Sequence, residues 1–442
     1  MSDTQRSDRK TQRSDRKTQR SDLKTRREPA AGRPHEIVVL GAGYTGMLAA
    51  IRLAHRTGKR GVHITLVNPS DRFTERLRMH QVAAGAELAD HRITDLLAGT
   101  GVTFRRAAAT AIDPVAHRVI CDDGFELGYD TMVYALGSRA DTTTVPGVAE
   151  HAWTLDDPRT AHRMSQRLAE LEAGGAGAVA VCGGGLTGVE AATEIAESHP
   201  DLTVTLISTG EPAAMMGERP RAYVERALDR LNIVRRSGTR VTKVLPDAVR
   251  LDSGVMVPAG LTLWTAGVRV PALAAVAGIA TDATGAIVTD ATLRSISHPD
   301  IYAIGDAAAI TQPWGRMHGT CQSGMPTAAY AADAIARRLR GKSVRPFRFG
   351  YFHQPVSLGR RDAVIGFTHA DDSPRRAYLK GRAAVRYKEI VSSSPVPTFR
   401  LSRRANVSVT LSRGDVRRAR PTGSRREGIC PDIAGARSIG RG

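Results

Sequence analysis

Gly41-Ala42-Gly43-Tyr44-Thr45-Gly46 is a Gly-rich turn, and the chain carries a second copy 142 residues later, Gly183-Gly184-Gly185-Leu186-Thr187-Gly188. An apolar run that predicts a strand precedes each turn, at residues 37–40 and 178–182. Each turn opens an Ala-rich stretch that predicts a helix. The order of strand, turn and helix is the context that gives this motif its meaning.

The spacing of the glycines is typical of a site for the pyrophosphate of a dinucleotide. The first glycine permits the sharp bend, the second leaves room for the phosphates, and the third lets the helix pack closely on the strand. The N-terminus of the helix adds unpaired N–H groups and the positive end of its dipole. We therefore expect two dinucleotide sites, with contacts from Gly41, Gly43, Tyr44, Thr45 and Gly46 at the first turn and from Gly183, Gly185 and Gly188 at the second.

Length and composition fit a chain with several cores, since it has 442 residues of which 41% are hydrophobic. No apolar run approaches the roughly 18 to 20 residues that cross a bilayer, and the N-terminus has no hydrophobic signal segment. We expect a cytoplasmic protein, and peripheral contact with the inner face of the cell membrane stays open. The isolated cysteines disfavour a disulfide framework, a zinc site and a dithiol centre, and no metal is expected; these are Cys121, Cys182, Cys321 and Cys430.

The net charge of +19 belongs to the two ends of the chain. Residues 1–33 hold eleven basic and five acidic side chains, and residues 400–442 hold eleven and three, which leaves +5 for residues 34–399. The N-terminal end is a repeat of seven residues, Thr-Gln-Arg-Ser-Asp-Arg-Lys, that is too polar to form a core. Both ends are expected to be disordered tails, and the charge does not indicate a nucleic-acid-binding body. Whether the N-terminal tail is a genuine binding arm or a dispensable start stays open.

Between the tails the pattern predicts two βαβ units. The first joins a helix at 47–56 to a strand at 62–67, and the second joins a helix after the turn to a strand at 203–207. A further strand is expected at 130–137 and a helix at about 160–172. Near the C-terminus the pattern predicts strands at 355–358 and 363–367, whereas the Ser- and Pro-interrupted stretch 391–409 shows little helical periodicity.

Three more motifs follow the two turns in a fixed order. They are Ala135-Leu136-Gly137-Ser138, Leu263-Trp264-Thr265-Ala266-Gly267-Val268 and Ile301-Tyr302-Ala303-Ile304-Gly305-Asp306-Ala307. Together with the Gly-rich turns, they resemble the flavoproteins that have two dinucleotide-binding domains. Within that group the chain is most similar to the type II NADH dehydrogenases, over residues 35–388.

This resemblance implies an α/β fold of two Rossmann-like domains and a small C-terminal α+β domain. The FAD-binding domain would comprise residues 34–149 and 270–340, with the NAD(P)H-binding domain, 150–269, inserted into it. The C-terminal interface domain would span 341–399. The first turn would then bind FAD, and the second would bind NADH or NADPH as substrate.

The resemblance also implies roles for particular residues. Asp306, after Gly305, would accept hydrogen bonds from the flavin ribityl chain, and Glu190 would lie near the nicotinamide. Gln322 matches the first glutamine of the acceptor-side segment Ala-Gln-x-Ala-x-Gln of type II enzymes, whereas Pro326 stands where the second would be. Further cofactor contacts are expected from Ala135, Gly137, Thr265, Gly267 and Arg78, and His80 is an equal candidate to Arg78.

The residues that end the second strand of each βαβ unit leave the choice of coenzyme open. An acidic residue usually binds the adenosine ribose there, but this chain has Asn68 in the first unit and Ser208 in the second. Asn68 can still bond a ribose hydroxyl. Ser208 does not repel the additional phosphate of NADPH, and Arg219 or Arg221 could assist its binding.

Three functions follow as hypotheses. The first is an FAD-dependent NAD(P)H dehydrogenase that passes electrons to a quinone, and the second is a soluble reductase for a small redox protein such as ferredoxin or rubredoxin. The third is a flavin-binding interaction protein that resembles apoptosis-inducing factor and holds phosphates with its tails. Removal of both tails separates them, because only the third hypothesis predicts lost binding. The resemblance also leaves a homodimer open.

Overall fold

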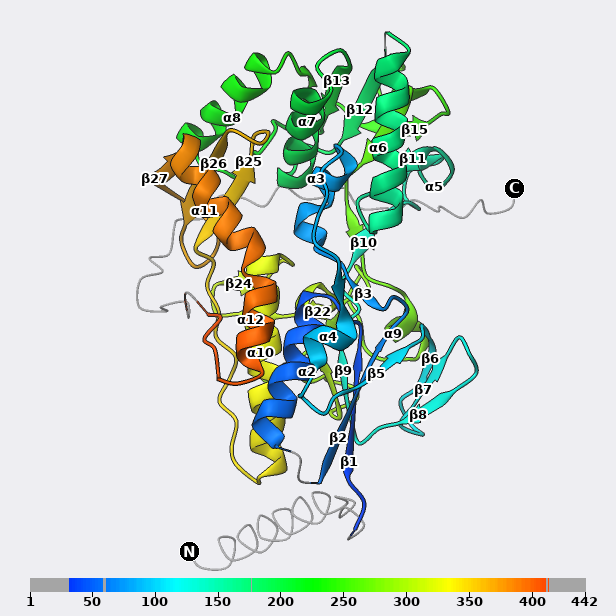
Figure 1. The fold of residues 1–442 in the computed structure, drawn as a ribbon, viewed down its shortest axis with the longest axis vertical. Helices are drawn as coiled ribbons and strands as arrows, with labels where there is room; N and C mark the ends of the chain where they lie inside the picture. The colour runs from blue at the N-terminus through cyan, green and yellow to red at the C-terminus, as the bar shows by residue number, and fades with distance from the viewer. Residues whose placement is uncertain (1–31, 59–60, 176, 411, 413–442) are drawn as a thin grey trace, which may run out of the picture.

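The computed structural model describes residues 32–58, 61–175, 177–410 and 412. The N-terminal repeat and most of the basic C-terminal tail lie outside the described residues. Figure 1 shows an elongated molecule in which one sheet lies below and a second above, with α11 and α12 running along one side of both. The predicted α/β class with two Rossmann-like sheets and a C-terminal antiparallel sheet is confirmed.

The first sheet is parallel and has the strand order β21-β9-β1-β2-β5. Its strands are Ile301–Ala303, Thr131–Tyr134, His35–Leu40, Val62–Asn68 and Thr103–Arg106. The inner strands are almost continuously apolar because both faces of a parallel sheet are covered. Helices α2 (Tyr44–Thr57) and α10 (Cys321–Leu339) pack against one another on one of these faces.

The second sheet is also parallel, with the order β11-β18-β12-β13-β14. Its strands are Ala152–Trp153, Leu261–Trp264, Ala178–Cys182, Thr203–Ile207 and Val234–Arg236. One face packs on helices α6 (Pro158–Ala173), α7 (Leu186–Ser198) and α8 (Glu218–Arg230). The other packs on a three-stranded antiparallel sheet of β15 (Val241–Val244), β16 (Ala248–Leu251) and β17 (Met256–Pro258), and Cys182 is buried there as a small apolar residue.

The second sheet is built from chain that lies between two parts of the first. The chain leaves the first sheet after β9 and returns to it at β21, which pairs with β9. The two crossing segments, β10 (Arg139–Ala140) and β19 (Val268–Arg269), pair with one another in antiparallel fashion. This double connection brings the carboxyl ends of the two sheets to a common junction (Figure 1).

The shorter elements complete the two units. In the first they are β3 (Arg72–Phe73), η1 (Arg76–Arg78), α3 (Met79–Ala83), β4 (His91–Arg92), α4 (Ile93–Leu97), β6 (Ala109–Asp113), β7 (Arg118–Cys121), β8 (Glu126–Gly128), α9 (Leu273–Val276), β20 (Ile287–Val288), η2 (Gly305–Ala307), β22 (Ala308–Ala309), β23 (Thr311–Gln312) and β24 (Gly315–Arg316). Helix α5 (Val148–His151) leads into the second. In the part of the chain that the structure describes, no helix is both long and apolar enough to span a bilayer.

The C-terminal part is an antiparallel sheet of β25 (His353–Ser357), β26 (Ala363–Thr368) and β27 (Pro374–Lys380), followed by α11 (Gly381–Ser393) and α12 (Pro395–Ser402). The expectation of little helix after residue 391 is wrong. Pro395 occupies the first turn of α12, where a missing N–H costs nothing. Phe399 is fully buried and meets Phe73 edge to face at 5.2 Å, so tertiary contacts supply what the periodicity lacks.

The folded chain also extends past the predicted tail boundary at Arg400. Helix α12 ends at Ser402, and the carbonyl of Val407 accepts a hydrogen bond of 2.7 Å from the Arg52 guanidinium. The apolar side chains Val396 and Phe399 of this helix are buried in the first unit. They are therefore part of the core and do not form an apolar surface stripe.

Candidate functional site

The first Gly-rich turn is built as the glycine spacing predicts. Gly41 has a φ of 95°, and a Cβ there would lie 2.5 Å from the Ala135 carbonyl oxygen. A Cβ on Gly46 would overlap the backbone carbonyl of Gly41, so the helix can approach only without a side chain. A Cβ on Gly43 would meet nothing within 4 Å. Gly43 is also the N-cap of α2, and no side chain caps this end of the helix.

The second turn repeats this geometry. Gly183 has a φ of 127°, and a Cβ there would lie 2.5 Å from the Thr265 hydroxyl. A Cβ on Gly188 would overlap the Gly183 carbonyl, whereas one on Gly185 would meet nothing within 4 Å. Gly185 caps α7 without a side-chain hydrogen bond. Both turns therefore present an open, uncapped helix N-terminus of the kind that fits a pyrophosphate.

Asp306 lies in the first unit where the third motif predicted it. It follows β21 in the short helix η2, is half-buried, and accepts a hydrogen bond of 2.8 Å from the Ser138 hydroxyl. Gly319 passes so close that a Cβ there would overlap the Asp306 carboxylate. Gly305 has a φ of 66° and packs on the Thr45 side chain. The structure thus brings the third motif and the first turn together.

Asn68 and Ser208, which lie at the end of the second strand of each βαβ unit, form hydrogen bonds with nearby backbone groups. The Asn68 side chain accepts a bond of 3.0 Å from the Ala42 N–H and donates one of 2.8 Å to the Ser70 carbonyl. The Ser208 hydroxyl donates to the Gly210 carbonyl at 2.6 Å. Thr265 likewise donates to the Cys182 carbonyl, at 3.0 Å. Of the remaining predicted contacts, Tyr44 packs on Phe73, and Gly137 and Gly267 adopt φ values of 64° and 80°.

Glu190 lies at a junction of all three parts of the fold. Its Oε1 is 2.7 Å from the Lys388 ammonium of α11 and accepts a bond of 3.0 Å from the Ser357 N–H at the end of β25. The side chains of Glu190 and Lys388 are only 9% and 11% exposed. His80 of α3 is buried beside them and interacts electrostatically with both.

Burial shapes the charges at this junction. It would raise the pKa of Glu190, but the Lys388 ammonium, His80 and the Ser357 N–H outweigh it, and the pKa is lowered. Burial lowers the pKa of His80 to about 4, helped by Lys388, Arg360 and Arg78 and opposed by Glu190. At neutral pH the junction therefore holds the Glu190 carboxylate and a neutral His80 imidazole beside Lys388.

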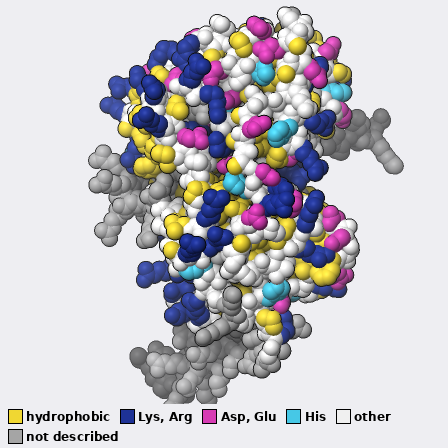
Figure 2. Space-filling view, in the orientation of Figure 1, with side chains coloured by type: hydrophobic (Ala, Val, Ile, Leu, Met, Phe, Trp, Pro, Cys, Tyr) yellow, Lys and Arg dark blue, Asp and Glu magenta, His cyan; other side chains and the backbone are white. Residues whose placement is uncertain are grey.

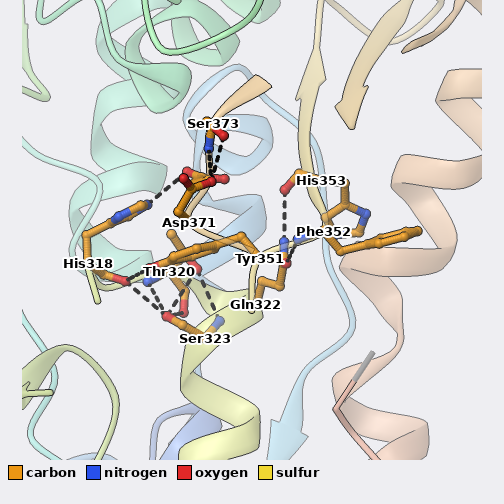
Figure 3. A network of polar contacts seen from close by, with 10 residues as sticks. His318, Thr320, Gln322, Ser323, Tyr351, Phe352, His353, Asp371 and Ser373 are labelled. Atoms are coloured by element: carbon orange, nitrogen blue, oxygen red, sulfur yellow. Dashed lines mark hydrogen bonds and ion pairs between the residues drawn. The ribbon is translucent and has the colours of Figure 1, made fainter. Parts of the chain in front are cut away.

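Gln322 fastens the start of α10 to the C-terminal part (Figure 3). Its amide donates to the His353 carbonyl at 2.8 Å and accepts from the Phe352 N–H at 2.7 Å. Thr320 and Ser323 form a capping box at the same helix end. The Tyr351 hydroxyl donates to the His318 carbonyl at 2.5 Å, while the His318 ring stacks on Tyr351. The predicted acceptor-side glutamine thus orders the backbone of the segment that enters β25.

Two neighbouring residues of α11 form ion pairs with other parts of the fold: Lys388 with Glu190 of α7, and Glu389 with Arg78 at the start of α3. The Arg78 guanidinium lies 3.0 Å from the Glu389 carboxylate of α11 and 3.1 Å from the Gln81 amide oxygen. Sequence reasoning missed Lys388, Glu389 and Ser357. The available signal was weak: Lys388 follows the buried Ala384 at helical spacing and so lies on the inner side of α11.

We expect the two buried histidines to make the protein sensitive to acid. Burial lowers the pKa of His353 to about 4, as it does for His80. The unfolded chain binds these protons below about pH 6.5 and the folded protein does not, so stability is complete above that pH and falls towards pH 4. The loss is up to about 3 kcal/mol for each histidine. Urea unfolding at pH 7 and pH 4 measures it.

The matched variants for this measurement are His353→Gln and, as a control, His369→Gln at an exposed position. His353→Gln should weaken the pH dependence of the unfolding free energy, whereas His369→Gln should leave it as in the wild type. An unchanged pH dependence in His353→Gln contradicts the prediction.

Two parallel sheets, each with an open glycine turn before a helix that no side chain caps, are typical of the class of proteins that bind dinucleotides. The sequence profile of the pyridine nucleotide-disulphide oxidoreductases matches residues 35–334. The chain belongs to this family of oxidoreductases, whose members bind FAD and NAD(P)H.

Known relatives lie at moderate sequence distance. An NADH dehydrogenase-like protein of Mycobacterium tuberculosis is 28% identical over 379 residues, which cover 81% of this chain and 93% of the relative. The type II NADH:quinone oxidoreductase of Staphylococcus haemolyticus is 26% identical over 395 residues, 82% of this chain and 95% of its own length. The resemblance to type II NADH dehydrogenase-like proteins is thus confirmed as distant homology.

Solved structures share the fold. NDH2 from Plasmodium falciparum in complex with NADH superimposes with a TM-score of 0.71 at 16% identity, over 84% of this chain and 97% of that one. The sulfide:quinone oxidoreductase of Aquifex aeolicus gives a TM-score of 0.72 at 21% identity, over 83% and 92%. These similarities establish the fold of the C-terminal part as well as that of the two sheets.

Proposed function

We propose that the protein is an FAD-dependent NAD(P)H dehydrogenase that passes hydride from NAD(P)H to FAD and then electrons to a quinone-type acceptor. The observation that carries the proposal is the junction at Glu190. There the helix behind the second Gly-rich turn contacts Lys388 of α11 and faces His80 of the first unit. Donor, flavin and acceptor must meet closely for this chemistry, and the junction joins the three parts of the fold.

The first turn and the N-terminus of α2 would hold the FAD pyrophosphate, with Asp306 and Ser138 beside the ribityl chain. The second turn and the N-terminus of α7 would hold the pyrophosphate of NAD(P)H. FAD supplies the ability to take up a hydride and to release its electrons to a different acceptor. The protein contributes orientation and the exclusion of water.

Glu190 would position the nicotinamide, because it follows the second turn by one helical turn and is fixed by Lys388 and the Ser357 N–H. On the acceptor side, Gln322 would act through the backbone of Phe352 and His353. Phe352 is exposed and Lys388 is not, so the two residues offer an apolar entrance and a buried cation to a quinone headgroup.

Charge favours a second acceptor, an acidic redox protein. Residues 341–399 carry eleven basic and four acidic side chains, a net +7, whereas residues 34–340 carry thirty and thirty-two, a net −2. Figure 2 shows Lys and Arg side chains gathered over α8, β27 and the start of α11, where Arg375, Arg376 and Arg382 are exposed. Such a surface also favours peripheral contact with an anionic membrane.

Anaerobic stopped-flow measurements test the function. The flavin band of the purified protein is expected to bleach with NADH or with NADPH and to return when menadione is added. Reoxidation by ferredoxin and not by menadione would favour the second acceptor. A colourless protein, or a bound flavin that neither coenzyme reduces, would overturn the proposal.

Replacing Gly185 with Ala should weaken coenzyme binding alone. The added Cβ projects into space that is open in this structure and that the pyrophosphate would occupy. We expect KM for the coenzyme to rise about tenfold, equivalent to about 1.4 kcal/mol, with unchanged flavin content. Gly128→Ala, also in open space but in β8, is the control. An unchanged KM in Gly185→Ala would place the coenzyme elsewhere.

A further inference from the structure

Helix α7 carries a row of three glutamates on the side that faces the C-terminal part. Glu190, Glu194 and Glu197 follow one another at spacings of four and three residues and therefore lie on one face of the helix. Glu190 and Glu194 are buried, and Glu197 is half-buried. The row thus leads from the surface of the molecule to the junction at Glu190.

Glu197, the outer glutamate, connects α7 to the turn after β25. Glu197 accepts a hydrogen bond from the Arg360 backbone N–H in the turn after β25. A Cβ on Gly359 would lie 2.7 Å from the Glu197 carboxylate, and Gly359 has a φ of 84°, so glycine is needed for this contact. Glu190, the inner glutamate, also has partners, because it forms an ion pair with Lys388 and accepts a hydrogen bond from the Ser357 N–H.

Glu194, the middle glutamate, is different because one of its two carboxyl oxygens has no hydrogen-bond partner. The Arg360 guanidinium lies 3.3 Å from Oε1 of Glu194, whose side chain is 2% exposed. The other oxygen, Oε2, is buried without a hydrogen-bond partner. Arg360 itself is 45% exposed and so connects Glu194 to solvent. A buried carboxyl group with a free oxygen can take up a proton there at little cost.

The surroundings of Glu194 bring its pKa into the neutral range. Burial raises the pKa of Glu194 to about 7; Arg360 opposes the rise, and Glu197 and Glu190 add to it. Lys388 of α11 and His80 of α3 face Glu190 and not Glu194. A carboxyl group that is half protonated near pH 7 can both give and accept a proton there.

The proposed reaction needs one proton from the protein. NAD(P)H and a quinone yield NAD(P)⁺ and a hydroquinone: two electrons and one proton leave the coenzyme as hydride, and the hydroquinone gains two electrons and two protons. The second proton comes from solvent. Hydride transfer to the flavin takes up no proton, so the demand falls on the reduction of the acceptor.

We propose that Glu194 relays this proton from solvent at Arg360 to the Glu190 end of the junction, a role that rests on the quinone-reducing function proposed above. Glu190 and Glu194 are four residues apart in α7, which corresponds to a rise of about 6 Å along the helix axis. The relay requires one bridging water between their carboxyl groups. In this role Glu194 passes the proton on towards Glu190 and does not contact the acceptor, so it is a positioning residue. His80 is fully buried and neutral, and Glu197 is bound to the backbone, so neither serves as well.

The test compares Glu194→Gln, Glu194→Asp and the control Glu197→Gln in the two half-reactions measured separately. With Glu194→Gln we expect reduction by the coenzyme at the wild-type rate, and reoxidation by menadione at least about tenfold slower, with an altered pH profile and solvent isotope effect. Glu194→Asp keeps a titrating group and should restore much of the rate. Glu197→Gln keeps the Glu194 carboxyl group, so it should leave reduction unchanged and reoxidation close to the wild-type rate, with only the small pH shift that follows from removing a charge near Glu194.

The comparison of Gln with Asp separates relay from packing. Gln is isosteric with Glu and can still accept from Arg360, so a structural role predicts that Gln is the milder change. A Glu194→Gln protein that is reoxidised at the wild-type rate and pH profile overturns the relay alone. A wild-type protein that quinone never reoxidises overturns the proposed function, and the relay with it.

A readout without turnover completes the test. Infrared difference spectra between pH 5 and pH 9 should contain a protonated carboxyl band that titrates near pH 7 and is missing from Glu194→Gln. The unfolding temperature of the wild type should also fall relative to that of Glu194→Gln as pH rises from about 5 to about 7, because the folded state favours the protonated form of Glu194. A spectrum without the band overturns the proposal whatever the activity.

Discussion

Replacing Gly46 with Ala is expected to destabilise the first unit by about 3 kcal/mol and to leave the purified protein without flavin. The added Cβ would overlap the Gly41 carbonyl oxygen, a backbone atom that no side-chain rotation can move away. Helix α2 would have to withdraw from the turn, which would displace its N–H groups from the phosphate position. Urea unfolding and the ratio of visible to ultraviolet absorbance measure the two effects.

Gly43→Ala is the matched control for this substitution. It adds the same methyl group three residues before Gly46 in the same turn, where a Cβ would meet no atom within 4 Å. We expect a stability loss of at most about 1 kcal/mol, since Gly43 is a helix N-cap, but a lower affinity for FAD. If Gly46→Ala unfolds like the wild type and retains its flavin, close packing of α2 on the turn does not require glycine at position 46.

Replacing Lys388 with Met is expected to cost about 3–5 kcal/mol in unfolding free energy, because it leaves the Glu190 carboxylate buried without its counter-charge. The two groups are 2.7 Å apart and nearly inaccessible to solvent. The pKa of Glu190, which Lys388 helps to lower, should rise. Denaturant unfolding at pH 7 measures the loss.

Two variants show whether the pair itself is responsible. Arg386→Met removes an exposed cation of the same helix and should change stability by less than about 0.5 kcal/mol. The double variant of Glu190→Gln with Lys388→Met removes both charges and should recover much of the lost stability. If the double variant is as unstable as Lys388→Met alone, packing of the lysine stem and not the unpaired charge explains the effect.

The sequence by itself determined the two Rossmann-like units and their order. The strand at 178–182 and the strand at 203–207 have the predicted bounds, and helix α2 begins within three residues of its predicted start. These elements could be predicted because their signals are local. Apolar runs with short repeats set the strands, and the turns need glycine wherever a Cβ would meet backbone.

Only the tertiary structure decided how the junction is assembled. Glu190 is 167 residues from Ser357 in the sequence and still farther from Lys388, so their pairing depends on how β25 and α11 pack on α7. Helix α12 forms because Phe399 is buried beside Phe73, although its own sequence has little helical pattern. Local propensity carries no information on such contacts, because burial and charge pairing between distant segments arise only when the whole chain packs.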